Sequence, residues 1–145
     1  MEETPFGPII YAFTRKQAIE EGIQVRCPDD LRKEAGFTVP LFFTRRAWDK
    51  YVEVPKGMEG FQDLTGRLWD ILTMLKYYAR KHRTEESFDF RFMCRIPNAG
   101  NWEKHERMTD PKDKTIRQVS LTAQAGPVDP DDMSMCITIS IPGED

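Results

Sequence analysis

The strongest constraint on the fold is a helical hydrophobic pattern over residues 63–83. Apolar residues recur there three or four positions apart, which places them on one stripe of a helix. The stripe consists of Leu64, Leu68, Ile71, Leu72, Leu75, Tyr78 and Ala79. Burial of a Leu or Ile side chain contributes roughly 1.5–3 kcal/mol, whereas Gly66 in the first turn costs only about 1 kcal/mol. We therefore expect one long amphipathic helix over residues 62–83.

Three segments after this helix alternate apolar and polar residues, as strands with one buried face do. They cover residues 88–96, 115–125 and 133–141. The expected inward residues are Phe88, Phe90, Phe92, Cys94 and Ile96, then Val119, Leu121, Ala123 and Ala125, then Met133, Met135, Ile137, Ile139 and Ile141. The predicted fold class is α+β: a single domain over residues 1–145, in which an antiparallel three-stranded sheet over residues 88–141 packs on the long helix.

Residues 1–54 predict short helices and strands. The expected elements are strands at 9–13 and 23–27 and helices that begin at Thr14, Pro28 and Thr44. Thr14 with Gln17 has the spacing of a capping box. Pro40 removes a backbone donor from the apolar segment 37–43, so that segment is expected to be an edge strand or an irregular crossing.

The composition is that of a soluble globule of one domain. No apolar run approaches the roughly 20 residues that cross a bilayer, and the acidic start MEET does not resemble a secretory signal. Cys27, Cys94 and Cys136 are odd in number and widely spaced. This favours reduced thiols and a cytoplasmic location.

Charge is distributed unevenly along the chain, whose net charge is −3. Residues 44–83 contain nine basic and five acidic residues, whereas residues 119–145 contain five acidic residues and no basic one. Such a split either orients a partner or reflects an uneven polar surface. The net charge is too negative for a generic duplex binder and too small for whole-protein mimicry of DNA.

Catalytic and metal motifs are absent from the sequence. The soft metal ligands are Cys27, Cys94, Cys136, His82 and His105, none paired at the spacing typical of zinc sites. Nucleophilic catalysis needs a positioned base. A Cys–His pair formed by folding stays open, but no catalytic residue, metal or cofactor is expected.

Two segments are candidates for binding a protein partner. The polar excursion at residues 97–114 is long for a hairpin connection and is expected to be either functional or mobile. It contains Trp102, Arg107 and Met108, residue types that are enriched at interface hot spots, although Trp102 folding back as a lid on the sheet is an equal alternative. The second patch is the acidic turn with Asp129, Asp131 and Asp132, which turn preference also explains.

The end of the long helix is the candidate for binding nucleic acid. Its basic and aromatic residues are Lys76, Tyr77, Arg80, Lys81 and Arg83. Cations of this kind contact phosphates, and Tyr77 is positioned to stack on a base. A solvated helix end, whose basic residues complement the helix dipole, explains the same pattern.

Several blocks of the chain resemble a family of small uncharacterised proteins encoded by bacteriophages, plasmids and other bacterial mobile elements. The blocks are IIYAFTRKQAIEEG, TRRAW, GRLWDILTML, VSLTAQAGP and ITISIPGED, which are spread over most of the chain. The excursion at residues 97–114 is longer than expected of a member. The resemblance implies a bacterial host cell as the setting, and it carries over no catalytic residue.

Three functions follow from these observations. The leading hypothesis is a non-enzymatic accessory protein that binds and inhibits a host protein or ribonucleoprotein complex, such as a defence nuclease or effector, in the manner of an anti-CRISPR or anti-restriction protein. The first alternative is a nucleic-acid-binding accessory protein that uses the basic helix end. The second is an enzyme acting on a nucleotide signal.

Overall fold

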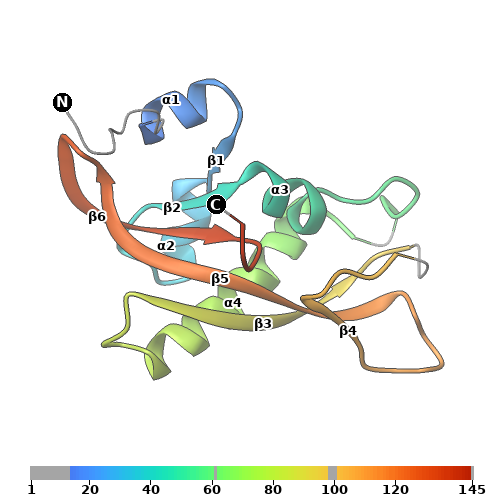
Figure 1. The fold of residues 1–145 in the computed structure, drawn as a ribbon. Helices are drawn as coiled ribbons and strands as arrows, with labels where there is room; N and C mark the ends of the chain where they lie inside the picture. The colour runs from blue at the N-terminus through green and yellow to red at the C-terminus, as the bar shows by residue number, and fades with distance from the viewer. Residues whose placement is uncertain (1–13, 61, 98–100, 145) are drawn as a thin grey trace.

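A computed structural model describes residues 14–60, 62–97 and 101–144. These residues form a six-stranded sheet with helices on both faces (Figure 1). The helices are α1 (Arg15–Glu20), α2 (Asp29–Glu34), α3 (Arg45–Ala47), the π-helical turn η1 (Trp48–Val52) and α4 (Leu64–Lys81). The strands are β1 (Gln24–Arg26), β2 (Leu41–Thr44), β3 (Ser87–Arg95), β4 (Glu106–Met108), β5 (Ile116–Asp129) and β6 (Asp132–Ser140). The predicted strand at residues 9–13 lies outside the described residues.

The sheet is mixed, in the order β1-β2-β6-β5-β3, with β4 also paired to β5. The expectation of a helix packed on a sheet is confirmed in that coarse form. The three predicted strands pair antiparallel as β3, β5 and β6, but the sheet is larger and mixed, because β1, β2 and β4 join it and β2 lies parallel to β6. The predicted edge strand with Pro40 is an interior strand between β1 and β6. Pro40 precedes the strand, and its carbonyl accepts from the Ile137 amide (3.1 Å). The missing donor therefore does not interrupt the ladder.

The excursion at residues 97–114 contains a strand that the sequence did not predict. β4 pairs with Arg117–Val119 of β5, on the edge of β5 that β6 occupies farther along the chain. Its three residues are too short for a recognisable alternation. β5 in turn continues past residue 125 to Asp129, because its last residues pair with the start of β6.

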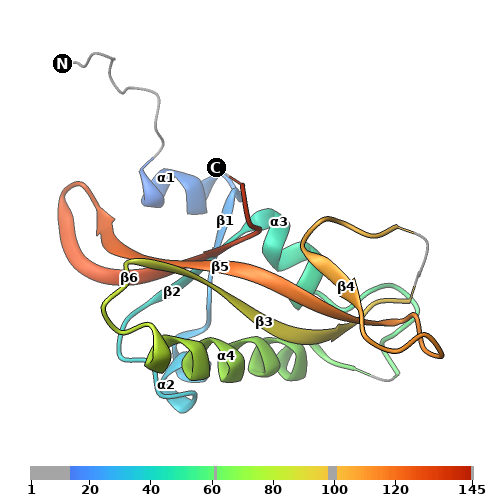
Figure 2. The same ribbon diagram turned by 60° about the horizontal axis from the view of Figure 1, so that its bottom comes forward.

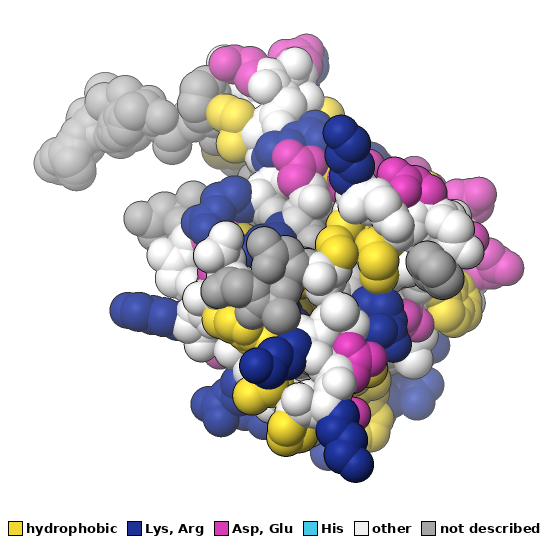
Figure 3. All heavy atoms as spheres, turned by 90° about the vertical axis from the view of Figure 1, so that its right-hand side faces the viewer, with side chains coloured by type: hydrophobic (Ala, Val, Ile, Leu, Met, Phe, Trp, Pro, Cys, Tyr) yellow, Lys and Arg dark blue, Asp and Glu magenta, His cyan; other side chains and the backbone are white. Residues whose placement is uncertain are grey.

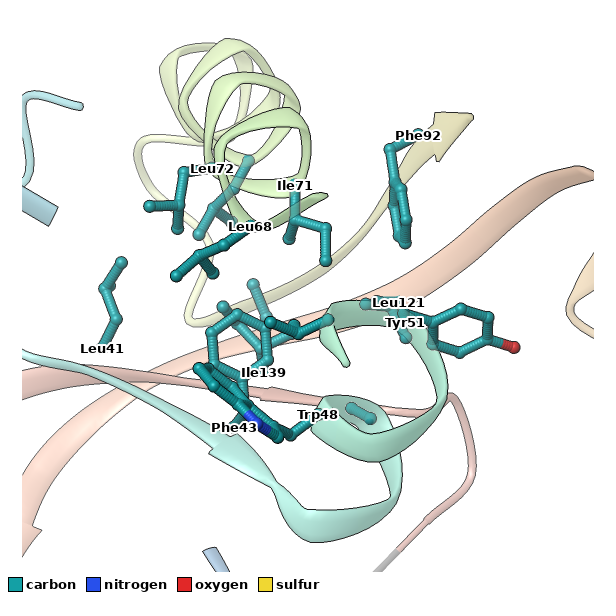
Figure 4. Close-up of a cluster of buried hydrophobic side chains, with 14 of the residues drawn as sticks. Leu41, Phe43, Trp48, Tyr51, Leu68, Ile71, Leu72, Phe92, Leu121 and Ile139 are labelled. Carbon is teal, nitrogen blue, oxygen red and sulfur yellow. The ribbon is translucent and has the colours of Figure 1, made fainter. Parts of the chain in front are cut away.

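The main core lies between the sheet and α4, which runs along one face of the sheet (Figure 2), and Trp48, Tyr51 and Val52 of η1 belong to the same core. The α4 residues Leu68, Ile71, Leu72 and Leu75 are fully buried against it. Figure 4 shows Leu68, Ile71 and Leu72 directed toward residues of β2, β5, β6 and η1. Asp63 begins α4 as its N-cap, since its carboxylate accepts from the Gly66 amide (2.6 Å).

The opposite face of the sheet is partly covered by α1. Thr14 and Gln17 form the complete capping box of this helix. The Arg15 guanidinium lies 4.4 Å from the centre of the buried Phe42 ring, and this contact joins α1 to the sheet. None of the helices within the described residues is long and apolar enough to span a membrane.

The predicted inward face of the last strand is only partly right. Ile139 and Ile141 are buried, but Met133 is 72% and Met135 is 52% exposed. The β5–β6 hairpin extends past α4 (Figure 1), so none of the described helices covers its tip on that side. Cys136, expected on the outer face, is buried instead.

Candidate binding groove

A depression runs along the N-terminal half of α4 and the end of β3. Its inner part is a cavity of about 280 Å³ lined by Tyr51, Gln62, Arg67, Asp70, Phe92, Met93, Cys94, Arg95 and Ile116. Its outer part is a hollow of about 530 Å³ lined by Glu59, Gly60, Gln62, Asp63, Gly66, Arg67 and Asp70. Three residues line both parts, so we treat the two as one site and call it the acidic groove.

The floor of the acidic groove is the buried guanidinium of Arg67. Its Nε donates to Tyr51 O (3.0 Å), its Nη1 to Gln62 Oε1 and Arg95 O (both 2.9 Å), and its Nη2 to Lys50 O (3.3 Å) and Cys94 Sγ (3.2 Å). A guanidinium has five N–H donors in all. Since every donor is engaged within the protein, Arg67 has none to offer an anionic ligand, and the groove does not suit a phosphate.

The rim of the acidic groove carries three carboxylates, those of Glu59, Asp63 and Asp70. Asp63 is engaged as the α4 cap. Burial raises the pKa of Asp70, although nearby Arg67 acts in the opposite direction. A cation in the groove would stabilise the charged form of Asp70 and offset its desolvation. The three carboxylates outnumber the two guanidinium groups of the lining, those of Arg67 and Arg95, so the groove as a whole favours a positively charged guest.

Tyr51 connects the cavity to a buried polar cluster behind it. The Tyr51 hydroxyl donates to Glu106 Oε2, and His105 Nε2 lies 2.6 Å from the same hydroxyl. Arg117 Nη1 donates to the other Glu106 oxygen (2.6 Å). Burial, followed by the bond to Glu106, raises the Tyr51 pKa far above its usual value. The Glu106 side chain is completely buried, so a substrate could not reach it as a catalytic base. The geometry suits a structural contact that joins η1, β4 and β5.

The three residues of the first predicted partner patch differ in their exposure to solvent. Trp102 is half-buried, with the Arg117 guanidinium 4.1 Å from its ring centre. Arg107 and Met108 are exposed on β4. Figure 3 views this end of the molecule, where exposed hydrophobic side chains lie among scattered Lys and Arg side chains. Met108 pairs with Arg117, whose neighbour Ile116 lines the cavity.

The second predicted partner patch lies elsewhere. The Asp129 carboxylate accepts from the backbone amides of Arg15 (2.5 Å) and Lys16 (3.3 Å), which ties the β5–β6 hairpin to α1. Asp132 accepts from the Ser134 amide (3.0 Å), and Asp131 is exposed. The hairpin and β4 lie at opposite ends of β5 (Figure 1), so the structure does not bring the two patches together.

The predicted nucleic-acid residues are also dispersed. Lys81 Nζ lies 4.4 Å from the centre of the Tyr77 ring. Lys76 lies against Gly36 at the end of α2, whose φ of 96° is a conformation that favours glycine. Arg80 and Arg83 are exposed. Lys76 and Lys81 are thus held in separate contacts within the protein.

Sequence reasoning did not select the residues of the acidic groove. Asp70 lies on the polar side of the predicted helix, where a solvated position is the ordinary expectation. The available signal was spacing, because Glu59, Asp63 and Asp70 follow one another by four and seven residues. Such spacings repeat one face of a helix, although Glu59 precedes the helix in the structure.

No group of three His, Cys, Asp or Glu side chains suited to a metal ion occurs among the described residues. Comparison of the chain with protein-family models, with curated proteins and with solved structures finds no match. The proposals below therefore rest on the chemistry of the acidic groove and on the resemblance carried by the sequence blocks.

Proposed function

We propose that this chain is a non-enzymatic binding protein that attaches to a basic surface of a host protein complex and blocks it. The complex is a defence nuclease or effector, so the chain would act in the bacterial cytoplasm as an anti-restriction or anti-CRISPR type of inhibitor. The resemblance to proteins of mobile elements supports this setting. The acidic groove supports the mode of attachment.

The observation that carries the proposal is a cavity that places apolar side chains beside an acidic rim. An Arg or Lys side chain has an aliphatic stem and a charged head. Phe92 and Ile116 in the cavity offer apolar surface to such a stem, and Asp70 offers a carboxylate to the head. Arg67 keeps its positive charge although its donors bond to neutral acceptors of the protein, so the charged head of the guest is expected at the rim carboxylates rather than against this guanidinium.

A nuclease is a suitable source of such a guest. Proteins that contact the nucleic-acid backbone present Lys and Arg side chains to the phosphates. A protein that occupies those side chains competes with the nucleic acid for them. Arg107 and Met108 are exposed on β4, at the same end of the molecule as the acidic groove, and would add contacts to the partner there. Half-buried Trp102 would support these two residues.

The proposal is tested by plasmid transformation of cells that carry one restriction or CRISPR nuclease, with and without this chain. We expect the chain to raise the transformation efficiency of a targeted plasmid toward that of an untargeted one. The combined change Glu59→Gln and Asp70→Asn should abolish the effect, because it removes two rim charges and preserves the α4 cap. A matched control, Glu20→Gln with Glu34→Gln, removes two exposed charges from α1 and α2 and should retain it.

Two results would count against the proposal. One is unchanged transformation across restriction and CRISPR nucleases of every type tried. The other is equal protection by the rim variant and by the control variant. A gel shift in which the chain itself binds DNA at low salt, and loses binding with Arg80→Gln and Arg83→Gln, would favour the nucleic-acid alternative instead.

A further inference from the structure

Among the residues that the structure describes, the strand β3 forms a long open edge of the sheet. It is the last strand in the sheet order, and its nine residues contrast with the three of β1 at the other edge. The Ile96 amide donates to Thr115 O, and the Ala125 amide donates to Glu86 O. In an antiparallel ladder the backbone N–H and C=O groups of successive residues point alternately toward and away from the neighbouring strand. The backbone groups of Ser87, Asp89, Arg91, Met93 and Arg95 therefore point away from β5.

One end of this edge is already closed by side chains. The Arg95 carbonyl accepts from Arg67 Nη1 (2.9 Å) and from Gln62 Nε2 (3.3 Å). The part of the edge that stays open extends from Ser87 to Met93. Its central residue is Phe90.

Apolar side chains accompany the open edge on the α4 side. A hollow of about 470 Å³ beside it is lined by Trp69, Asp70, Thr73, Met74, Phe92 and Met93. Trp69 is 40% and Met93 is 47% exposed. Long open edges with apolar flanks recruit another strand unless something covers them.

We propose that a second copy of this chain covers this edge, with β3 pairing antiparallel to β3 of the other copy about a two-fold axis at Phe90. Charge selects this register. Asp89 then lies opposite Arg91 of the second copy, and the symmetry repeats the pair. An axis at Asp89 would instead place Asp89 of the two copies directly opposite one another, and an axis at Arg91 would do the same for Arg91. Like charges directly opposite are destabilising.

The geometry supports the pairing in two further respects. Four facing pairs of outward residues between Ser87 and Met93 would form about eight backbone hydrogen bonds. Thr122 Oγ1 donates to Asp89 Oδ1 (2.7 Å), which holds the carboxylate on the sheet face where Arg91 of the second copy would arrive. Glu59 and Asp63 of the acidic groove lie outside the paired segment, whereas Asp70, Phe92 and Met93 line both the groove and the hollow beside the edge. The dimer does not depend on the proposed function.

Sedimentation equilibrium of the purified chain tests the pairing by charge reversal. The wild type should sediment as a dimer. Asp89→Arg alone and Arg91→Glu alone should each weaken dimerisation about tenfold, because two-fold symmetry gives two like-charge pairs in each variant. The double variant restores opposite charges across the axis, and its dissociation constant should return to within about threefold of the wild type.

A second measurement follows the same edge directly. In hydrogen exchange, the amides of Asp89, Arg91 and Met93 should be protected in the wild type and exposed in Arg91→Glu. Lys33→Glu on α2 is the control for a charge reversal distant from the edge, and Thr122→Val is the control for the lost Asp89 contact. A wild type that stays monomeric up to about 1 mM would overturn the pairing. So would a dimer that neither single reversal weakens, or one that the double reversal fails to restore.

Discussion

At the scale of single residues, Arg67 is the side chain on which most of this end of the molecule depends. It lies on α4, yet its bonds reach the backbone of η1 and of β3. A buried guanidinium whose partners are carbonyls holds those carbonyls in place. The sequence indicated only that Arg67 lies off the apolar stripe, since helical period reveals a polar side but not what approaches it.

We predict that Arg67→Met lowers the free energy of unfolding by about 3 kcal/mol, because the carbonyls of Lys50, Tyr51 and Arg95 lose their donor in a buried site. Urea denaturation measures the change. Arg80→Met on the exposed side of the same helix is the control and should change stability by no more than about 0.5 kcal/mol. A loss below about 1 kcal/mol for Arg67→Met would show that Arg67 does not hold this region together.

His105 gives the molecule a pH dependence of stability with a definite sign. Burial lowers the pKa of His105 below its usual value. As the pH falls through about 6.5, the unfolded chain therefore binds a proton before the folded protein does. Stability is lost as the pH falls from about 7 toward the folded pKa. The lowered pKa values of Asp29, Asp113 and Asp132 act only at more acidic pH, below about 4.

His105→Gln should therefore flatten the stability of the protein between about pH 7 and pH 5. Urea denaturation at the two pH values measures the difference, with the wild type as reference. Glutamine retains an amide donor that can reach the Tyr51 hydroxyl, so the change mainly removes the titration. An identical loss of stability in the two proteins over this interval would exclude His105 as its source.

At the scale of elements, the β5–β6 hairpin and α1 are joined through Asp129. Asp129 was a partner-binding candidate in the sequence, and the structure shows that both of its oxygens accept from the first amides of α1. A carboxylate at this position satisfies unpaired donors and complements the helix dipole. Turn preference alone could not reveal this contact, because the two segments are 113 or 114 positions apart.

Asp129→Ala should accelerate hydrogen exchange across α1 about fivefold, which corresponds to the loss of about 1 kcal/mol typical of a helix cap. Asp131→Ala, two residues away and exposed, is the matched control and should leave exchange in α1 unchanged. Equal exchange in the two variants would mean that Arg15 and the Phe42 contact suffice to hold the helix.

The strands also differ in how well the alternation of apolar and polar residues predicts them. β3 and the first part of β5 alternate cleanly because α4 covers one face and the other meets solvent. β2 was misassigned because Pro40 was expected to interrupt its ladder, whereas Pro40 precedes the strand; the continuous apolar run of β2 is typical of an interior strand with both faces covered. β4 is too short to carry a pattern. Met133 and Met135 follow the alternation but extend beyond the reach of α4, so they stay exposed.

At the scale of the whole molecule, the acidic groove arises where the end of β3 passes the start of α4. Its apolar side chains and its acidic rim come from segments far apart in the chain, Tyr51, Asp70 and Ile116 among them. The uneven charge along the sequence did not indicate this location, because the most acidic segment, residues 119–145, does not line the groove. Such a site follows from packing and could not be predicted before the strand neighbours were known.

The central claim is that the acidic groove captures a basic surface of a defence nuclease. The most direct measurement is cleavage of target DNA by a purified restriction or CRISPR nuclease to which the purified chain is added. We predict that stoichiometric chain slows cleavage, and that Glu59→Gln with Asp70→Asn relieves the inhibition while Glu20→Gln with Glu34→Gln does not. Inhibition that persists unchanged in the rim variant would contradict the assigned surface, and undiminished cleavage by every nuclease tested would contradict the function.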